Sequence, residues 1–303
     1  MKWITVLTLL VVVACGGTHE PPAPVAEEPT PAAAGGPTSA AAGPESVPSP
    51  DGVPIAFTVA GDGSPALIFI HGWMCNQSFW LPQVAEFAPT HTVVTIDLAG
   101  HGQSGKARDG WPLMAFGADV QAVVEHLGLE RAILVGHSMG APVALEAARL
   151  MPGRVVGVVA VDSLHDADWK LDDEQKVGFL AAWEQDWPGT CARFVGSMFH
   201  NSADPALVKR VHADMCGGDA AIGLALMRQF LDYELGPALE TVDVPVRCIN
   251  SSANVSNIEG NRRYHADFDA VSMEGVGHFL MMEQPEAFNQ HLREIVADMS
   301  GAE

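Results

Sequence analysis

The stretch that decides the fold is ILVGHSMG, residues 133–140. An apolar, β-branched run ends there in Gly-x-Ser-x-Gly, and residues 141–148 follow with the apolar spacing of a helix. The pattern predicts a buried strand, a very sharp turn and a helix. Ser138 stands at the apex of the turn, where a strained backbone pushes the side chain clear of the sheet. Gly136 and Gly140 flank it because strand and helix nearly touch there and a Cβ would clash.

The same turn supplies a hydrogen-bond donor. The backbone N–H of Met139 lies in the first turn of the predicted helix and points toward the space above Ser138, so it can stabilise an oxyanion there. A Gly-x-Ser-x-Gly pattern on its own also occurs in ordinary surface turns. Because a predicted strand precedes it and a predicted helix follows it, a nucleophilic serine is the stronger hypothesis.

On this motif and its context the chain resembles the α/β-hydrolase family, and the resemblance extends from about Gly52 to the C-terminus. It implies an α/β fold with a mostly parallel sheet flanked by helices, a triad of serine, histidine and an acid, and neither a cofactor nor a metal. Residues 164–239 break the alternation of strands and helices, and the family inserts a helical cap at this place, after the sixth strand. We therefore expect one hydrolase domain over residues 51–303, with its cap at about residues 164–239.

The first predicted strands lead to a second oxyanion donor. Residues 53–65 are expected to form an edge hairpin, and residues 66–70 are a continuous apolar run that predicts a buried central strand. This run ends in His71-Gly72-Trp73. In the family the residue after His-Gly provides the other oxyanion N–H, so the resemblance gives that role to Trp73, while we expect His71 to hold the loop.

The resemblance also identifies a base. His278 follows the last predicted strand, Gly-x-Gly precedes it, and the amphipathic pattern of residues 285–299 follows it. This placement matches the catalytic histidine of the family. Asp97 and His101 lie in a glycine-rich turn after an earlier strand, and we expect them to be architectural because their polar atoms can satisfy loop backbone groups.

At the position of the triad acid, the sequence departs from the usual family pattern. The loop that most often carries this carboxylate reads NSSAN here, residues 250–254. A minority of the family carries the acid one strand earlier, and Asp162 stands at the carboxyl end of that strand, residues 155–161. A carboxylate is needed to orient the histidine and to stabilise the imidazolium. Asp162 is the expected acid, and Asp166 and Asp168 are weaker alternatives.

These residues predict a serine hydrolase that cleaves a small-molecule carboxylic ester through an acyl-enzyme. Ser138 would attack, His278 would transfer the proton, Asp162 would orient the histidine, and two backbone N–H groups would hold the oxyanion. The same triad supports lactone, thioester or carbon–carbon hydrolysis and cofactor-free perhydrolysis, so these activities stay open. A non-catalytic binding scaffold is the remaining alternative, and its one supporting feature is the missing carboxylate in residues 250–254.

Composition limits the partners. The chain has 303 residues, of which 48% are apolar, and a formal net charge of -21. The apolar content suffices for one large core, and the negative charge argues against nucleic acid and anionic lipid headgroups as partners. The oligomeric state stays open.

The N-terminus resembles a bacterial lipoprotein signal. Residues 1–14 hold one lysine and an apolar run too short to span a bilayer, and a lipobox-like sequence ends at Cys15. The resemblance implies cleavage before Cys15, a lipid anchor on its sulfur and attachment to the bilayer of the cell envelope, at the outer membrane, with the domain in the periplasm or at the cell surface. The alternative is an ordinary secretory signal with a chance cysteine. Residues 15–50, rich in Pro and Ala, are expected to form a disordered tether.

Four of the five cysteines lie beyond the signal. In an exported protein an even number favours disulfides. Cys191 and Cys216 are the expected pair because both lie in the helical insertion, which a cross-link would stabilise most. Cys75 and Cys248 lie in or just after predicted strands, where they can pack as small apolar side chains.

Overall fold

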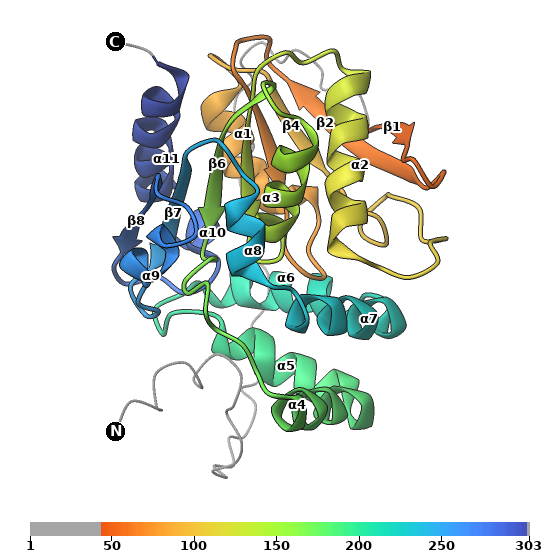
Figure 1. Cartoon of the computed structure of the whole chain (residues 1–303). Helices are drawn as coiled ribbons and strands as arrows, with labels where there is room; N and C mark the ends of the chain where they lie inside the picture. Colours follow the sequence, from red (N-terminus) through yellow and green to blue (C-terminus); the bar gives the residue numbers. More distant parts are fainter. Residues whose placement is uncertain (1–43, 302–303) are drawn as a thin grey trace, which may run out of the picture.

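A computed structural model describes residues 44–301, so the predicted signal, Cys15 and most of the predicted tether lie outside the described residues. Eight strands form one sheet in the order β1-β2-β4-β3-β5-β6-β7-β8 (Figure 1). From β4 to β8 all neighbours are parallel, and β1 and β2 add an antiparallel edge. The strands are β1 (Glu45–Pro48), β2 (Pro54–Ala60), β3 (Ala66–Ile70), β4 (Val93–Ile96), β5 (Ala132–His137), β6 (Val155–Val161), β7 (Val246–Ser251) and β8 (Phe268–Met273).

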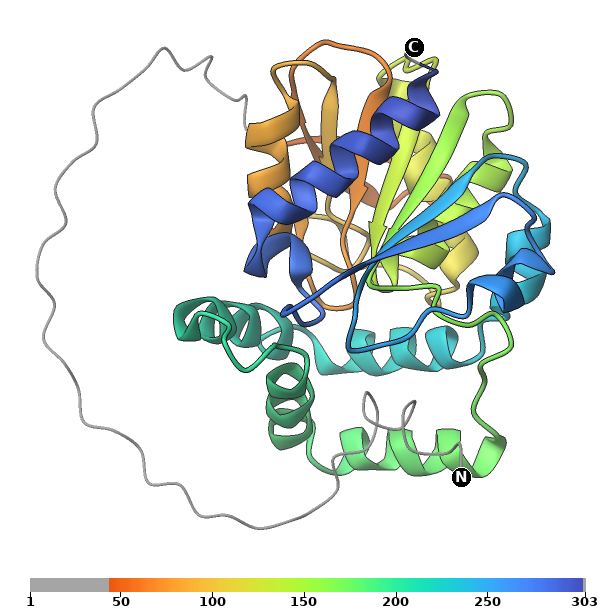
Figure 2. The same ribbon diagram turned by 90° about the vertical axis from the view of Figure 1, so that its left-hand side faces the viewer.

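Helices cover both faces of the sheet. Figure 2 shows α1 and α11 across one face, with α2 and α3 on the other. Because both faces are covered, every residue of β3, β4 and β5 is buried, which explains their continuous apolar sequences. The helices that do not lie between β6 and β7 are η2 (Gln77–Trp80), α1 (Leu81–Phe87), α2 (Leu113–His126), α3 (Gly140–Leu150), α9 (Ile258–Arg262), α10 (Leu280–Glu283) and α11 (Pro285–Ser300).

The predicted fold class is confirmed, and two local predictions at the sheet edge are wrong. Residues 53–65 do not form a hairpin, because β2 pairs with β1 and β4 while β3 lies between β4 and β5. A fully apolar strand such as β3 is stable only where it is covered on both sides, so it takes the centre of the sheet. The tether prediction fails at its end, because Glu45–Pro48 form β1. An edge strand needs backbone partners on one side only and therefore tolerates Pro48.

Five helices lie between β6 and β7, of which α4 to α7 form a cap beyond the carboxyl ends of the parallel strands, while α8 packs against α3 beside the sheet (Figures 1 and 2). They are α4 (Asp173–Gln185), α5 (Trp187–Ser197), α6 (Pro205–Cys216), α7 (Ala220–Leu231) and α8 (Leu235–Glu240). A disulfide between Cys191 and Cys216 joins α5 to α6, with 5.7 Å between the two Cα atoms. Cys75 and Cys248 are buried free thiols.

Among residues 44–301, no helix is both long enough and apolar enough to cross a membrane.

Candidate active site

The turn between β5 and α3 has the strained geometry that the sequence predicts. Ser138 has a φ of 52°, a left-handed conformation that is costly for a residue with a Cβ. A Cβ on Gly136 would lie 2.2 Å from the carbonyl oxygen of Gly140, and a Cβ on Gly140 would lie 2.4 Å from that of Ile70. Only glycine fits at either position, so the chain can turn sharply enough to present Ser138.

The loop after β3 packs directly against this turn. A Cβ added to Gly72 would lie 3.1 Å from the Cβ of Ser138. Trp73 is the next residue, so it lies beside Ser138, where the oxyanion is predicted to form. Among residues 44–301, the backbone N–H groups of Trp73 and Met139 donate no hydrogen bond to another residue. Both groups of the predicted pair are therefore available to a bound oxygen.

His71 fixes this loop as expected. Its Nε2 accepts a hydrogen bond from the Leu98 N–H at 3.0 Å, and its Nδ1–H donates to the carbonyl of Gly72 at 2.8 Å. Burial lowers the pKa of His71 to about 4, so the ring is neutral near pH 7. Asp97 is architectural too, because its carboxylate accepts hydrogen bonds from the backbone and side chain of Gln77.

Asp162 and His278 form a buried hydrogen-bonded pair. The His278 Nδ1–H donates to Asp162 Oδ2 at 2.6 Å, and Asp162 Oδ1 accepts from the Ser251 N–H at 2.8 Å. The Asp162 residue is only 3% exposed and has a φ of 44°, so it sits on a strained turn at the end of β6. With Nδ1 protonated and bonded to the carboxylate, the lone pair of His278 lies on Nε2.

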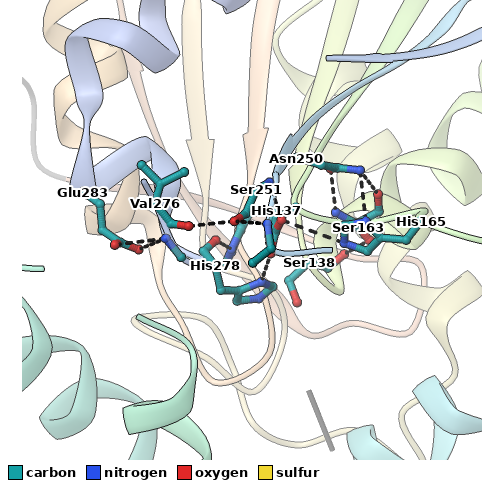
Figure 3. Close-up of polar contacts among 12 residues, drawn as sticks. His137, Ser138, Ser163, His165, Asn250, Ser251, Val276, His278 and Glu283 are labelled. Carbon is teal, nitrogen blue, oxygen red and sulfur yellow. Dashed lines mark hydrogen bonds and ion pairs between the residues drawn. The ribbon is translucent and has the colours of Figure 1, made fainter. Parts of the chain in front are cut away.

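Ser138 and His278 come from different ends of the chain and meet at one edge of the sheet. In Figure 3 the Ser138 side chain and the His278 ring project into the same space below the strand ends. Among the described residues no hydrogen bond joins the Ser138 hydroxyl to His278. Such bonds are often long in a free site and tighten when substrate binds.

The backbone of His278 is held from two sides. On the sheet side, the His137 Nε2–H donates to the His278 carbonyl at 3.0 Å, and the two ring centroids lie 4.6 Å apart. On the cap side, the His278 N–H donates to the carbonyl of Met198 at 2.6 Å. The carboxylate of Glu283 accepts from the Gly277 N–H at 3.1 Å, a contact visible in Figure 3. Burial lowers the pKa of His137 well below its usual range, so no second cation stands behind His278.

The side chains of Asn250 and His165, to which the sequence assigns no role, complete the polar cluster. Asn250 lies near the end of β7, in the stretch that the sequence predicts to be the usual acid loop, and its Oδ1 accepts from the Ser163 N–H while its Nδ2 donates to the Ser163 carbonyl, both at 3.1 Å. The same Nδ2 contacts His165 Nδ1 at 3.2 Å (Figure 3). Asn250 thus ties the ends of β6 and β7 together. The carboxamide in NSSAN was the one visible signal of this role.

A cavity of about 320 Å³ opens over Ser138, between the strand ends and the cap. Ser138, Met139 and Asp162 line its sheet side, and the lining side chains that the cap helices contribute are apolar. This volume is at the lower end of the range for small-molecule sites. In the chain from residue 44 to residue 301, no group of three or more His, Cys, Asp or Glu side chains is placed to hold a metal ion.

The sheet order, the turn at Ser138 and the capped cavity define an α/β-hydrolase architecture. The model of the alpha/beta hydrolase family matches residues 67–291, and the chain belongs to this family. The match covers the predicted nucleophile, acid and base together.

Individual proteins of known identity are similar to this chain. A non-heme chloroperoxidase of Streptomyces lividans is 36% identical over 272 residues, which cover 82% of this chain and 97% of that protein. The dihydrolipoyllysine-residue acetyltransferase component of the acetoin cleaving system of Pseudomonas putida is 33% identical over 156 residues, and the match spans 51% of this chain but only 40% of that relative. A thermophilic esterase from Thermogutta terrifontis superimposes with a TM-score of 0.74 at 21% identity, covering 86% of this chain and 100% of that one, which shows a shared fold.

Proposed function

We propose that this hydrolase cleaves a carboxylic ester through an acyl-enzyme formed on Ser138. One observation carries the proposal: a buried carboxylate, Asp162, accepts the Nδ1–H of His278 at 2.6 Å, which leaves Nε2 free on the side of Ser138. A serine hydroxyl is a weak nucleophile at neutral pH and needs a base of this kind.

In the first half of the reaction, His278 Nε2 accepts the Ser138 proton as Oγ attacks the ester carbonyl carbon. The carbonyl oxygen becomes an oxyanion that accepts hydrogen bonds from the N–H groups of Trp73 and Met139. When the tetrahedral intermediate collapses, the carbon–oxygen bond to the alcohol breaks and the alcohol leaves with the proton from His278. Removal of one such oxyanion donor typically lowers kcat by about 10²–10³.

In the second half, water replaces the alcohol. His278 takes a proton from water as the water oxygen attacks the acyl carbon, and the proton then returns to Ser138 as the acid leaves. The imidazolium that forms in each half is stabilised by Asp162, which the Ser251 N–H holds in place. The cap covers the cavity, and electrostatic interactions are stronger where less water surrounds the reacting groups.

A labelling experiment tests this proposal. A fluorophosphonate probe should label the wild-type protein, and Ser138→Ala should lose both the label and the hydrolysis of p-nitrophenyl esters. Ser202→Ala, which changes an exposed serine of the cap, is the matched control and should be labelled like the wild type. Equal labelling of Ser138→Ala and the wild type would refute the acyl-enzyme.

Perhydrolysis is a second candidate, and one comparison favours it. The non-heme chloroperoxidase of Streptomyces lividans matches this chain over 97% of its own length. In this reaction hydrogen peroxide, rather than water, would attack the acyl-enzyme, give up one proton to His278 and leave as the peracid, with Ser138 regenerated. Peracid release from an ester in the presence of hydrogen peroxide would support this activity, and its absence while hydrolysis continues would rule it out.

A further inference from the structure

The cavity over Ser138 has two chemically different halves. The sheet half holds the polar groups of the proposed mechanism, and the cap half is built from apolar side chains. We infer that the site selects neutral esters with an apolar acyl chain and discriminates against acyl chains that carry a carboxylate. This inference rests on the proposed ester hydrolysis and specifies which esters are substrates.

The cap helices offer the cavity dispersion contacts and no charge. Its wall includes Phe194 from α5, Met215 from α6, and Met227 and Phe230 from α7, with Met198 at the end of α5. The three methionines are 2–7% exposed, so their thioethers face the cavity or the cap interior rather than solvent. Methionine side chains are unbranched and adapt to irregular shapes, which suits a flexible hydrocarbon chain.

The cavity contains no fixed cation. No Lys or Arg is present among the described residues that line it. Two carboxylates do line it: Asp162, which holds His278, and Asp166, which accepts hydrogen bonds from the Asp168 N–H at 3.1 Å and from Asn257 at 3.2 Å. Neither carboxylate has a Lys or Arg partner, so both contribute negative potential to the site.

The remaining ionisable side chains that line the cavity do not change the sign of its electrostatic potential. His165 is a neutral imidazole near pH 7, with its Nδ1 3.2 Å from Asn250 Nδ2. Burial lowers the pKa of His165 and also of His137, in agreement with this assignment. Tyr233 donates its hydroxyl proton to Glu146 at 3.1 Å, and burial raises the pKa of the phenol, so it is neutral as well.

These features set the cost of a charged acyl group. A carboxylate at the end of the acyl chain would leave water for an apolar wall, without a cation to pair with and with two carboxylates nearby. A methyl group at the same position loses little hydration and gains contact with the methionines. We expect at least a 100-fold difference in kcat/KM, since even partial burial of an unpaired charge is strongly unfavourable.

The test compares two esters that differ only in this group. The probes are p-nitrophenyl hexanoate and the mono-p-nitrophenyl ester of adipic acid, which has the same chain length and ends in a carboxylate. With wild-type protein, and with the rate of Ser138→Ala subtracted as background, kcat/KM should be at least about 100-fold lower for the adipate ester. Asp166→Asn should raise the adipate-to-hexanoate ratio of kcat/KM, because it removes one repelling charge. Asp173→Asn, which changes an exposed carboxylate in the first turn of α4, is the matched control and should leave the ratio unchanged.

The outcomes distinguish a failure of the proposed acyl-chain preference from a failure of the proposed ester hydrolysis. Comparable kcat/KM values for both esters would overturn the substrate class and leave the esterase intact. Failure of the wild type to cleave either ester would overturn the proposed function, and this inference with it. A ratio that does not rise in Asp166→Asn would refute the role given to that carboxylate. Because each variant is judged by a ratio, a general loss of folded protein cancels.

Discussion

Asp162→Asn is the substitution that probes the proposed triad most directly. The side chain keeps its size and shape, and its oxygen remains the only group that can accept from the Ser251 N–H, now at 2.8 Å from Oδ1. The amide nitrogen must then face His278 Nδ1 in place of the oxygen that accepts at 2.6 Å. Two donors cannot share that contact, so His278 has to move its proton to Nε2. In that tautomer it cannot take the proton of Ser138.

The size of the effect follows from this tautomer change together with the lost charge. When an orienting acid of a serine triad is replaced by its amide, kcat falls by about 10⁴. At 1.36 kcal/mol for each factor of ten, this corresponds to about 5 kcal/mol of activation free energy. The fold should persist, because Asn preserves the hydrogen bond to Ser251 and adds no volume.

The assay is steady-state hydrolysis of p-nitrophenyl hexanoate, with circular dichroism and urea unfolding to verify that the variant is folded. Asp173→Asn is again the control, because it changes an exposed carboxylate of α4 and should stay within a few-fold of the wild type. A folded Asp162→Asn enzyme with kcat within ten-fold of the wild type would refute the assignment. The acid would then have to be sought at Asp166 or Asp168, or the site would work as a dyad.

Three further outcomes are expected. Intact-mass analysis of membrane-fraction protein should show a chain that begins at Cys15 with an added lipid, and a soluble mature protein with another N-terminus would refute the proposed anchor. Peptide mapping without reductant should recover Cys191 linked to Cys216, and finding both thiols free in exported protein would contradict the disulfide. Urea unfolding should show stability falling as the pH drops from about 6.5 to about 4, because the unfolded chain protonates His71 at its ordinary pKa of 6.5 while burial lowers the folded pKa to about 4. Between these values the unfolded state binds more protons, so this residue accounts for a loss of about 3 kcal/mol. The slope should persist in the exposed-site control His212→Gln and shrink in His71→Asn, and a flat profile in the wild type would contradict the linkage.

The centre of the fold was predictable because its sequence leaves few choices. A run such as residues 66–70 has no polar face and must be buried on both sides. In a parallel sheet the carboxyl ends of such strands lie at one edge, which is why residues as distant in sequence as Ser138, Asp162 and His278 could be expected to meet. The structure brings Asp162 and His278 into direct contact.

The parts that sequence could not supply depend on tertiary packing. The pairing of Glu45–Pro48 with β2 is a backbone interaction, and its short Pro-containing sequence gives no strand signal. The role of Asn250 depends on Ser163 and His165, which are more than eighty residues away and meet it only in the fold. The direction of each cap side chain depends likewise on how the cap helices pack, so the apolar wall could not be assigned residue by residue.

The hydrogen bond from the His278 N–H to the Met198 carbonyl links the two parts of the molecule that must cooperate. A Cβ on Gly277 would lie 2.3 Å from that same carbonyl oxygen, so the cap loop rests on the histidine loop without a gap. The backbone of the base therefore has one of its supports in the cap. A cap that lifted to admit a molecule would also remove a support of the base, and chemistry would wait for closure. Substitutions that disturb the contact between the cap and the His278 loop should accordingly lower kcat rather than raise KM, although the substituted residues do not touch the reacting atoms.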